Sequence, residues 1–309
     1  MEAELIRVDP TGQGKTGETI PVGELVTIGR SPGNNLVLSD GQVSRNHALI
    51  RSEGGEYLII DLGSANGTFV NDKPVTSATA LRSGDVLRLG ESLLLFKRDE
   101  PEPAPEEAAR KATQRVFANV NLAVLVSDVR NYTALSAALP ADGLSAILAD
   151  WFRRVGECID ARGGNIEKFR GDSVMAYWIS KPGGGDNAHI LGALRAAGDM
   201  LAASHEYDER LSSQYPDHAF RIGCGIHCGD AVLGNIGADS RRDFTTLGDS
   251  VNVTFRIESL CSGLNRPVLV SEEIKTQAGP EFAFDDLGPQ SLKGKPEPMN
   301  IYALRLADG

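Results

Sequence analysis

The chain has 309 residues, 41% of them hydrophobic and 24% charged, which is an ordinary globular composition, and its length predicts two domains at roughly 100–200 residues each. Asp and Glu outnumber Lys and Arg by 42 to 31, giving a net charge of −11 at pH 7, which argues against a nucleic acid or an anionic membrane as main partner. The sequence contains no run of about 18 apolar residues and no signal-peptide pattern, so we expect a soluble, cytoplasmic protein.

Short apolar runs separated by turn residues make up the first 98 residues. The intervening segments are rich in Gly, Asn, Ser and Pro. Strands at this spacing, without a helical period, are typical of an all-β sandwich. The predicted strands lie near 24–30, 35–40, 48–52, 56–61 and 85–96.

The clearest change in composition follows at residues 99–114, which we interpret as a linker. Between 99 and 107 proline alternates with acidic residues, and no large apolar side chain occurs. Such a segment cannot join a hydrophobic core, and proline stiffens it towards an extended form. The predicted domains are therefore 1–98 and 115–309.

Strands and helices alternate irregularly after the linker, which predicts an α+β domain. Apolar residues at helical spacing between 144 and 159 indicate a helix, and Gly163 and Gly164 supply its stop. The other expected elements are a buried strand at 119–127, two short strands around 170–172, a helix through 190–201 and a hairpin at 221–237.

The loops of the β domain contain polar residues suited to a phosphate group. Arg30 ends one predicted strand, Ser44 lies between two others, and Asn66 occupies a turn. A guanidinium, a hydroxyl and an amide together offer several donors to one tetrahedral anion. Each of these residues taken singly is more often part of an ordinary turn.

The order of these loop motifs resembles the forkhead-associated (FHA) domain over roughly residues 5–97. The matching motifs are Gly29-Arg30, Ser44-x-x-His47 and Asn66-Gly67. The FHA family binds phosphothreonine peptides. The resemblance implies that Arg30 and Ser44 bind the phosphate, that Arg45 is an auxiliary contact, and that Asn66 holds the peptide backbone. His47 matches a residue that stabilises the loop.

Two aspartates in the second domain are candidate metal ligands. Asp128 follows an apolar strand, and Asp172 lies at the tip of the hairpin expected around residues 170–172. If that hairpin pairs beside the first strand, the two carboxylates meet at one edge of the sheet. Paired carboxylates without His or Cys suit Mg²⁺ or Mn²⁺, and two such ions can promote an in-line displacement at phosphorus. Either acid alone is more often a solvated strand end.

A third segment adds groups that suit a nucleotide. Asn252 and Arg256 are four residues apart, so a helix places both on one face. Asn can hold a ribose oxygen, and Arg can neutralise charge that builds on a phosphoryl group. Lys293 adds a further cation suited to a polyphosphate. A helical Asn/Arg pair without this context is usually surface decoration.

With these segments in order, residues 115–305 resemble the class III nucleotidyl cyclases, whose catalytic domain has a ferredoxin-like α+β fold. The matching segments are SDVRNYTAL, IEKFRGDSVMAYW, GIHCGDAVLGNIG, FTTLGDSVNVTFRIE and LKGK.

The resemblance assigns a role to each matching residue. Two Mg²⁺ or Mn²⁺ ions per active site would be held by Asp128 and Asp172. Asn252 would orient the ribose and Arg256 would stabilise the transition state. The remaining substrate contacts would come from Lys168 and Thr245 at the purine, and from Lys293 and Arg241 at the phosphates. In this family the metal acids of one subunit face the Asn and Arg of another, so a homodimer is expected.

The two purine-reading positions indicate the substrate. Lys168 can donate to N1 of adenine, and Thr245 can accept from its amino group, whereas guanylate cyclases usually carry Glu and Cys there. A mismatched donor at a buried site costs ~1–3 kcal/mol. We therefore expect an adenylate cyclase, a phosphorus–oxygen lyase that forms cyclic AMP from ATP, with an FHA domain that binds a phosphothreonine protein.

Some features depart from the family pattern or leave alternatives open. Asn131 and Tyr132 replace the usual Gly-Phe after the first metal acid, and Asn tolerates the left-handed backbone that such a turn needs. Thr254 and Phe255 replace small residues before the arginine. The alternatives are a guanylate cyclase, and a phosphopeptide-binding adaptor whose cyclase-like domain serves only dimerisation.

Cys224, His227 and Cys228 hint at a metal site by their spacing. No second pair of ligands accompanies them, so we do not expect zinc.

Overall fold

Residues 3–8, 15–53, 55–98, 117–180, 187–238 and 241–305 are described by the structure, a computed structural model. They divide into two compact units, which are treated separately below. The first falls within Met1–Asn119 and also includes Val232–Thr246, and the second falls within Val120–Ser180, Gly184–Ala231 and Leu247–Gly309. The predicted linker, 99–114, lies outside the described residues, and the domain boundaries stay predictions.

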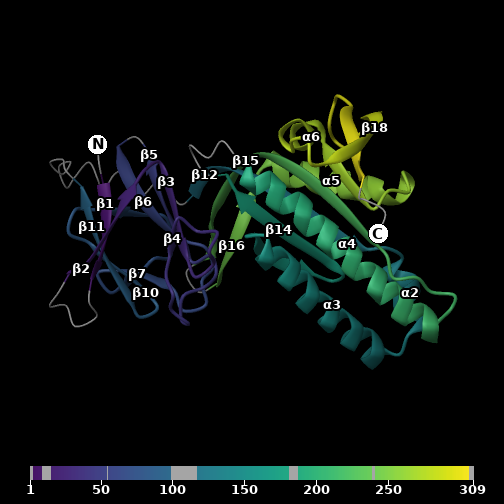
Figure 1. Ribbon diagram of the computed structural model, residues 1–309, viewed down its shortest axis with the longest axis horizontal. Coiled ribbons are helices and arrows are strands. Elements are labelled where there is room, and N and C mark those ends of the chain that lie inside the picture. The colour runs from purple at the N-terminus through teal and green to yellow at the C-terminus, as the bar shows by residue number, and fades with distance from the viewer. Residues whose placement is uncertain are drawn as a thin grey trace. The chain divides into compact units, whose positions relative to one another are not determined.

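Two β-sheets stacked face to face form the amino-terminal part, as the sequence predicted (Figure 1). The core between them consists of alternate strand residues such as Leu5, Ile28, Ile50, Leu87 and Phe96, all of them fully buried. One sheet has the order β2 (Lys15–Val22), β1 (Ala3–Val8), β11 (Ser92–Arg98), β10 (Val86–Leu89), β7 (Thr68–Val70), β8 (Lys73–Pro74). The other has the order β4 (Leu36–Val37), β3 (Leu25–Gly29), β5 (Ala48–Glu53), β6 (Glu56–Asp61), β9 (Thr79–Leu81).

The run at 85–96 forms two strands rather than the single strand expected. β10 and β11 pair antiparallel with Leu89 opposite Ser92, so the chain reverses at Gly90 and Glu91. Gly90 has φ +60°, a left-handed conformation that glycine adopts without steric cost.

An eight-stranded sheet carries the second part of the chain, which has the predicted α+β architecture. Its order is β13 (Asn165–Arg170), β14 (Ser173–Ile179), β12 (Phe117–Val129), β15 (Ile222–Ala238), β17 (Val268–Ser271), β19 (Met299–Arg305), β18 (Ala283–Gln290), with β16 (Arg241–Leu247) paired to β15. The helices are α2 (Tyr132–Ala138), α3 (Ala141–Ala161), α4 (Ala188–Gln214), α5 (Asp249–Gly263) and α6 (Glu272–Gln277).

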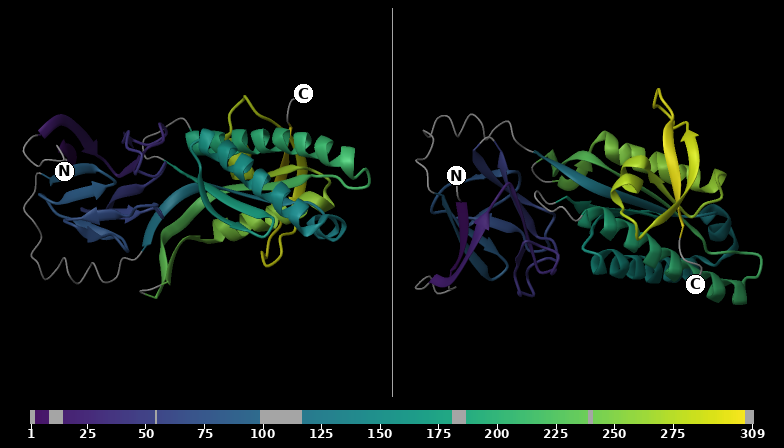
Figure 2. Two further views of the ribbon diagram at one scale, coloured as in Figure 1. Left: turned by 90° about the horizontal axis from the view of Figure 1, so that it is seen from below. Right: turned by 45° about the horizontal axis from the view of Figure 1, so that its top comes forward.

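Helices cover both faces of this sheet, as successive residues of β17 show. Val268 and Val270 join the core under α3 and α4, whereas Leu269 between them joins a separate core under α5. Because side chains alternate across a strand, α5 lies on the face opposite α3 and α4 (Figure 2). The expected hairpin at 221–237 is wrong: residues 222–237 belong to one long strand, β15, which pairs with β16.

Candidate phosphate-binding loops and candidate active site

Two loops of the sandwich are joined by hydrogen bonds that involve the predicted phosphate-binding residues. The Ala65 amide donates to Ser44 Oγ at 3.0 Å, and Asn66 Nδ2 donates to the Gln42 carbonyl at 2.7 Å. The backbone amide of Arg30 donates to the Ser44 carbonyl at 2.9 Å. The structure therefore brings Arg30, Ser44 and Asn66 to one set of adjoining loops.

The buried side chain of His47 holds these two loops together. It is fully buried, its Nδ1 accepts from the Ser44 amide at 2.9 Å, and its Nε2 lies 3.2 Å from the Gly67 carbonyl. Burial lowers the pKa of His47, so the ring is neutral near pH 7 and can accept at one nitrogen while it donates at the other. This geometry agrees with the structural role given to His47.

The charged groups at these loops are exposed. Arg30 and Arg45 both face solvent, and Arg30 Nε donates to the Val43 carbonyl at 3.3 Å. Gly29 allows the backbone at Arg45 to approach this strand closely, since a Cβ at Gly29 would lie 2.2 Å from the Arg45 carbonyl oxygen. An exposed guanidinium beside a serine hydroxyl is a suitable receptor for a phosphate dianion.

The two predicted metal acids come together at the strand ends of the second sheet. β14 pairs antiparallel with β12, with Val174 opposite Ser127, so Asp172 in the β13–β14 turn lies beside Asp128. Ser173 Oγ donates to Asp128 Oδ1 at 2.9 Å and orients that carboxylate. The hairpin arrangement assumed from the sequence is therefore the one observed.

The negative charge of the adjacent Asp128 and Asp172 carboxylates suits the binding of a divalent cation. Burial, and next the negative charge of Asp128, raise the pKa of Asp172 to about 6, because two adjacent carboxylates resist being ionised together. A bound cation relieves that repulsion. The described residues contain no cluster of three or more His, Cys, Asp or Glu side chains that could enclose a metal. Two carboxylates suit Mg²⁺ or Mn²⁺, which commonly take their other ligands from water and substrate phosphates.

Lys168 occupies a distorted point of the hairpin. The β13–β14 register skips Glu167 between the pairs Ile166–Ala176 and Lys168–Met175, which is a β-bulge. The Lys168 ammonium lies 2.9 Å from Glu167 Oε1, and its side chain remains half exposed. The other predicted purine residue, Thr245, is half-buried on β16. Arg241 begins the same strand, and its side chain lies outside the described part of the structure.

Helix α5 presents the predicted ribose and transition-state residues. Asn252 is exposed and Arg256 half-buried, one turn apart. The turn that contains Lys293 packs on Arg256, because a Cβ at Gly294 would lie 3.4 Å from Arg256 Nη2. In the same turn the Lys295 ammonium contacts the Asp249 carboxylate at the start of α5. Asn252, Arg256 and Lys293 thus belong to one local structure.

Alternate glycines on β15 let α5 lie directly against the sheet. A Cβ at Gly225 would lie 2.4 Å from the Glu258 backbone nitrogen and 2.7 Å from the Thr254 carbonyl oxygen, distances that only glycine permits. Thr254, which departs from the family pattern, is fully buried here, and its Oγ1 donates to the Ser250 carbonyl at 2.8 Å. The departure at Asn131 is also accommodated: it has φ +57°, as expected from the sequence.

Glu258 is a residue near the metal acids that the sequence reasoning missed. Burial, followed by the charge of Asp128, raises its pKa to about 7, while the Arg130 guanidinium acts in the opposite direction. Arg130 itself donates through Nη2 to the Cys261 carbonyl at 2.8 Å. The sequence does show an acid two residues after Arg256 and an arginine two residues after Asp128. Neither position, however, indicates by itself that the side chain is buried.

Arg256 and Glu258 lie on two faces of α5 that point in different directions. Arg256 and Glu258 are two residues apart, and such positions lie on opposite sides of a helix. The Glu258 carboxylate lies over Gly223 of β15, as does the side chain of Arg130, which follows β12. The charges of Asp128 and Asp172 raise the pKa of Glu258. Arg256, by contrast, contacts the turn at Gly294. Arg256 therefore faces away from the two aspartates of its own chain.

The Cys/His cluster does not converge on a metal. Cys224 and Cys228 face the core under α3 and α4, whereas His227, an odd number of positions away, points to the other face of β15. There His227 Nδ1 lies 2.8 Å from Ser271 Oγ. Burial raises the pKa values of both thiols, which suits inert core residues.

Across the described residues, no helix is both long and apolar enough to cross a membrane.

Comparisons with known proteins agree with both halves of the chain. Residues 26–90 match the FHA domain family, and residues 116–305, more than half of the chain, match the adenylate and guanylate cyclase catalytic domain family. The glycogen accumulation regulator GarA of Mycolicibacterium smegmatis is 48% identical over 70 residues, which are 23% of this chain and 44% of GarA.

Similar proteins also cover the second half. Adenylate cyclase 1 of Rhizobium meliloti is 30% identical over 206 residues, 64% of this chain and 30% of that protein. The crystal structure of the adenylyl cyclase CyaB from P. aeruginosa superimposes with a TM-score of 0.57 and 27% identity, over 62% of this chain and 97% of that one. The chain thus spans less than a third of the R. meliloti protein and under half of GarA.

Proposed function

The chain belongs to the adenylate and guanylate cyclase catalytic domain family, with an FHA domain before the catalytic domain, and on this premise we propose that it converts ATP to 3′,5′-cyclic AMP and pyrophosphate as a homodimer. The observation that carries the proposal is the division of α5. Asp128 and Asp172 lie towards one side of this helix, while Arg256 faces away from them. One chain therefore holds two half-sites, and a second copy is needed to close each.

Exposed apolar side chains next to functional residues support the binding of a second copy. Phe169 lies next to Lys168 and is 42% exposed, and Phe255 lies next to Arg256 and is 44% exposed. Leu247, just before α5, is 47% exposed. Large apolar residues exposed next to polar functional groups are typical of surfaces that another protein covers.

In the proposed reaction the 3′-oxygen of ribose attacks the α-phosphorus, and the bond from that phosphorus to the β-phosphate oxygen breaks. The hydroxyl proton leaves to solvent, and pyrophosphate carries away the electron pair of the broken bond. Asp128 and Asp172 would hold the two Mg²⁺ or Mn²⁺ ions, which would neutralise charge and make the 3′-hydroxyl more acidic. Arg256 of the partner chain stabilises charge on the phosphoryl oxygens, and its Asn252 holds the ribose.

Substrate choice rests on two residues. Lys168 donates to N1 of adenine and Thr245 accepts from the adenine amino group, while Lys293 and Arg241 neutralise the triphosphate. GTP presents donors where ATP presents an acceptor, so it leaves the Lys168 ammonium facing a donor. ATP is therefore preferred. R. meliloti adenylate cyclase 1, by its name, has the same activity.

The FHA domain is proposed to bind a phosphothreonine protein that regulates or positions the enzyme. Support comes from the adjoining loops, where Arg30 is exposed, Ser44 Oγ is held by the Ala65 amide, and Asn66 is fixed to the Gln42 carbonyl. Ser44 Oγ accepts in that bond, so its proton is available to a phosphate oxygen. Arg45, also exposed, can add a second guanidinium.

The proposal is tested with the purified full chain, Mn²⁺, and either ATP or GTP. The expected result is cyclic AMP with ATP and a much slower reaction with GTP. Asp128→Ala and Arg256→Ala each abolish the activity, and mixing the two variants restores part of it, because one of the two sites in a mixed dimer is intact. Asp199→Ala and Arg195→Ala, which remove exposed partners of Arg162 and Glu281, leave activity unchanged.

Other outcomes identify the alternatives. A verified dimer without activity refutes the enzyme and supports a phosphopeptide-binding adaptor. Preference for GTP refutes the argument from Lys168 and Thr245 and indicates a guanylate cyclase. Failure of the two inactive variants to complement each other refutes the shared sites.

A further inference from the structure

Arg130 ties the metal-bearing strand to the far end of α5. It follows Asp128 by two residues, and its backbone amide donates to the Arg221 carbonyl at 2.8 Å. Its Nη2 donates to the Cys261 carbonyl and also contacts the Arg266 carbonyl. These acceptors lie in the last turn of α5 and just beyond it, where backbone carbonyls lack partners within the helix and attract a cation.

The Arg130 side chain and the Glu258 carboxylate both lie over one glycine of β15. A Cβ at Gly223 would lie 2.8 Å from Glu258 Oε1 and 3.4 Å from Arg130 Nε, so both groups border one small space on β15. Arg130 Nε is buried and has no hydrogen-bond partner among the described residues. A buried donor of this kind needs a nearby charge to compensate it, and Glu258 is the carboxylate that faces it.

Glu258 is in turn connected to the metal acids. Val129 joins the core under α3 and α4, so Asp128 beside it points to the face of the sheet that α5 covers. The charges of Asp128 and Asp172 both raise the pKa of Glu258. The helix that carries Glu258 also carries Asn252 and Arg256. Arg130 and Glu258 therefore lie where the strand end that holds Asp128 meets the helix that presents Arg256.

We propose that Arg130 and Glu258 are positioning residues that set α5 against the end of β12, and so align both half-sites of the chain. This inference rests on the proposed function, because in the homodimer the two half-sites of one chain belong to different active sites. The Arg130–Glu258 pair acts on Asp128 in one active site and on Arg256 in the other.

Mixed dimers separate these two effects. One chain carries Asp128→Ala and the other carries Arg256→Ala, and the two are co-expressed with different tags and purified as the heterodimer. A single complete site remains, made from Arg256 of the first chain and Asp128 of the second. Glu258→Gln, which has nearly the same shape without the charge, is then placed in one chain or in the other.

The expected results depend on the placement. In the chain that supplies Arg256, Glu258→Gln lowers kcat about tenfold, because the helix that presents Arg256 shifts, and leaves the Mn²⁺ half-saturation unchanged. In the chain that supplies Asp128, it raises the Mn²⁺ concentration for half-saturation about tenfold, as losses beside metal ligands do, and leaves kcat at saturating Mn²⁺ unchanged. Arg130→Lys, which keeps the charge but has fewer donors, gives the same pattern and serves if Glu258→Gln fails to fold.

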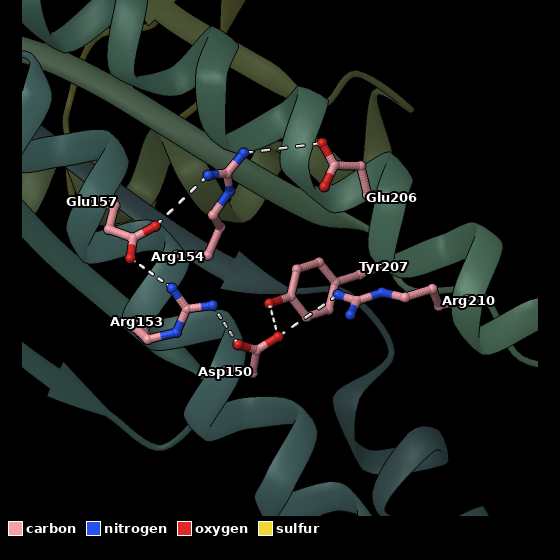
Figure 3. Close-up of polar contacts among 7 residues, drawn as sticks. All are labelled: Asp150, Arg153, Arg154, Glu157, Glu206, Tyr207 and Arg210. Atoms are coloured by element: carbon pink, nitrogen blue, oxygen red, sulfur yellow. Dashed lines mark hydrogen bonds and ion pairs between the residues drawn. The ribbon is translucent and has the colours of Figure 1, made fainter.

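A matched control is available on the opposite face of the sheet. Glu157 lies on α3, where its carboxylate is 2.6 Å from Arg153 Nη1 and 3.6 Å from Arg154 Nη1, in an exposed network (Figure 3). Exposed ion pairs of this kind contribute little. Glu157→Gln therefore changes neither kcat nor Mn²⁺ dependence in either placement.

Each remaining outcome has one meaning. If the heterodimer without further substitution is active and Glu258→Gln and Arg130→Lys have no effect in either chain, the positioning role is refuted and the proposed function stands. Equal losses from both placements, accompanied by a lower melting temperature, also refute it, because they indicate general loss of folded protein. If the unsubstituted dimer forms no cyclic nucleotide, the proposed function fails and the positioning role fails with it.

Discussion

A methyl group at Gly225 tests whether α5 must lie in contact with β15. The Gly225→Ala Cβ would be 2.4 Å from the Glu258 backbone nitrogen and 2.7 Å from the Thr254 carbonyl oxygen. These are backbone atoms, which cannot rotate away as a side chain can. An ordinary contact needs about 3.4 Å, so α5 has to move by roughly 1 Å.

Two consequences of that shift can be measured. Overpacking of a close contact costs about 1–3 kcal/mol of unfolding free energy. A displacement of roughly 1 Å in a catalytic group costs on the order of 100-fold in rate, so kcat for cyclic AMP formation falls by about that factor. Denaturant unfolding followed by intrinsic fluorescence measures the first effect, and a fixed-ATP assay with Mn²⁺ measures the second.

The same helix supplies the matched control. Gly263 ends α5, and a Cβ there would meet nothing within 4 Å. Gly263→Ala removes the entropic penalty of glycine, so it stabilises the protein by about 0.5–1 kcal/mol and leaves kcat unchanged. A Gly225→Ala protein with wild-type kcat and stability would refute the direct contact between α5 and β15. If Gly263→Ala lost as much kcat and stability as Gly225→Ala, the effect would not depend on the position of the glycine, and the reasoning would be refuted.

Four further predictions concern separate parts of the chain. Mn²⁺ raises the melting temperature more at pH 7.5 than at pH 5. The pKa of Asp172 is raised from 3.8 to about 6, so between these pH values the folded state binds a proton that the unfolded state releases; metal-free stability falls as pH rises through this range, and Mn²⁺ has to displace the proton. Asp172→Asn removes this pH dependence, and an equal rise in melting temperature at both pH values would contradict the prediction. Arg30→Ala weakens binding of a phosphothreonine peptide at least tenfold by calorimetry, whereas unchanged affinity would exclude Arg30 from the site. Thr68→Val removes the 2.6 Å bond from Thr68 Oγ1 to Asp61 Oδ1 and lowers the unfolding free energy by about 1–3 kcal/mol; no loss in denaturant titration would show that this buried bond is dispensable. Lys168→Glu reduces the ratio of ATP to GTP turnover at least tenfold, and an unchanged ratio would remove Lys168 from the purine site.

Local pattern was sufficient to predict the two classes of fold. Alternating apolar runs with turn residues predicted the sandwich, and the helical spacing between residues 144 and 159 predicted α3. The errors concerned where a strand begins and ends, not which segments form strands. A continuous run from 85 to 96 contains a reversal at Gly90, and the glycine-rich segment at 221–237 extends as one strand. Glycines at 223 and 225 resembled turn signals, yet their reason is the close approach of α5.

The candidate site was partly accessible in the same way. The spacing of Asn252 and Arg256 and the sequence around Asp128 and Asp172 were enough to name these residues. Glu258 was not, because an acid in a helix is usually exposed, and only packing against β15 buries it.

The sequence by itself determined which chemical groups this protein carries and in what local geometry. A helix puts Asn252 and Arg256 on one face, and a hairpin puts Asp172 at its tip, since both follow from backbone periodicity over a few residues. Tertiary structure alone decided how distant segments meet. The pairing of β14 with β12 brought Asp172 to Asp128, and the packing of α5 over Gly225 set Glu258 towards these acids and Arg256 away from them. Such contacts depend on the burial and orientation of whole elements, which no short stretch of sequence encodes.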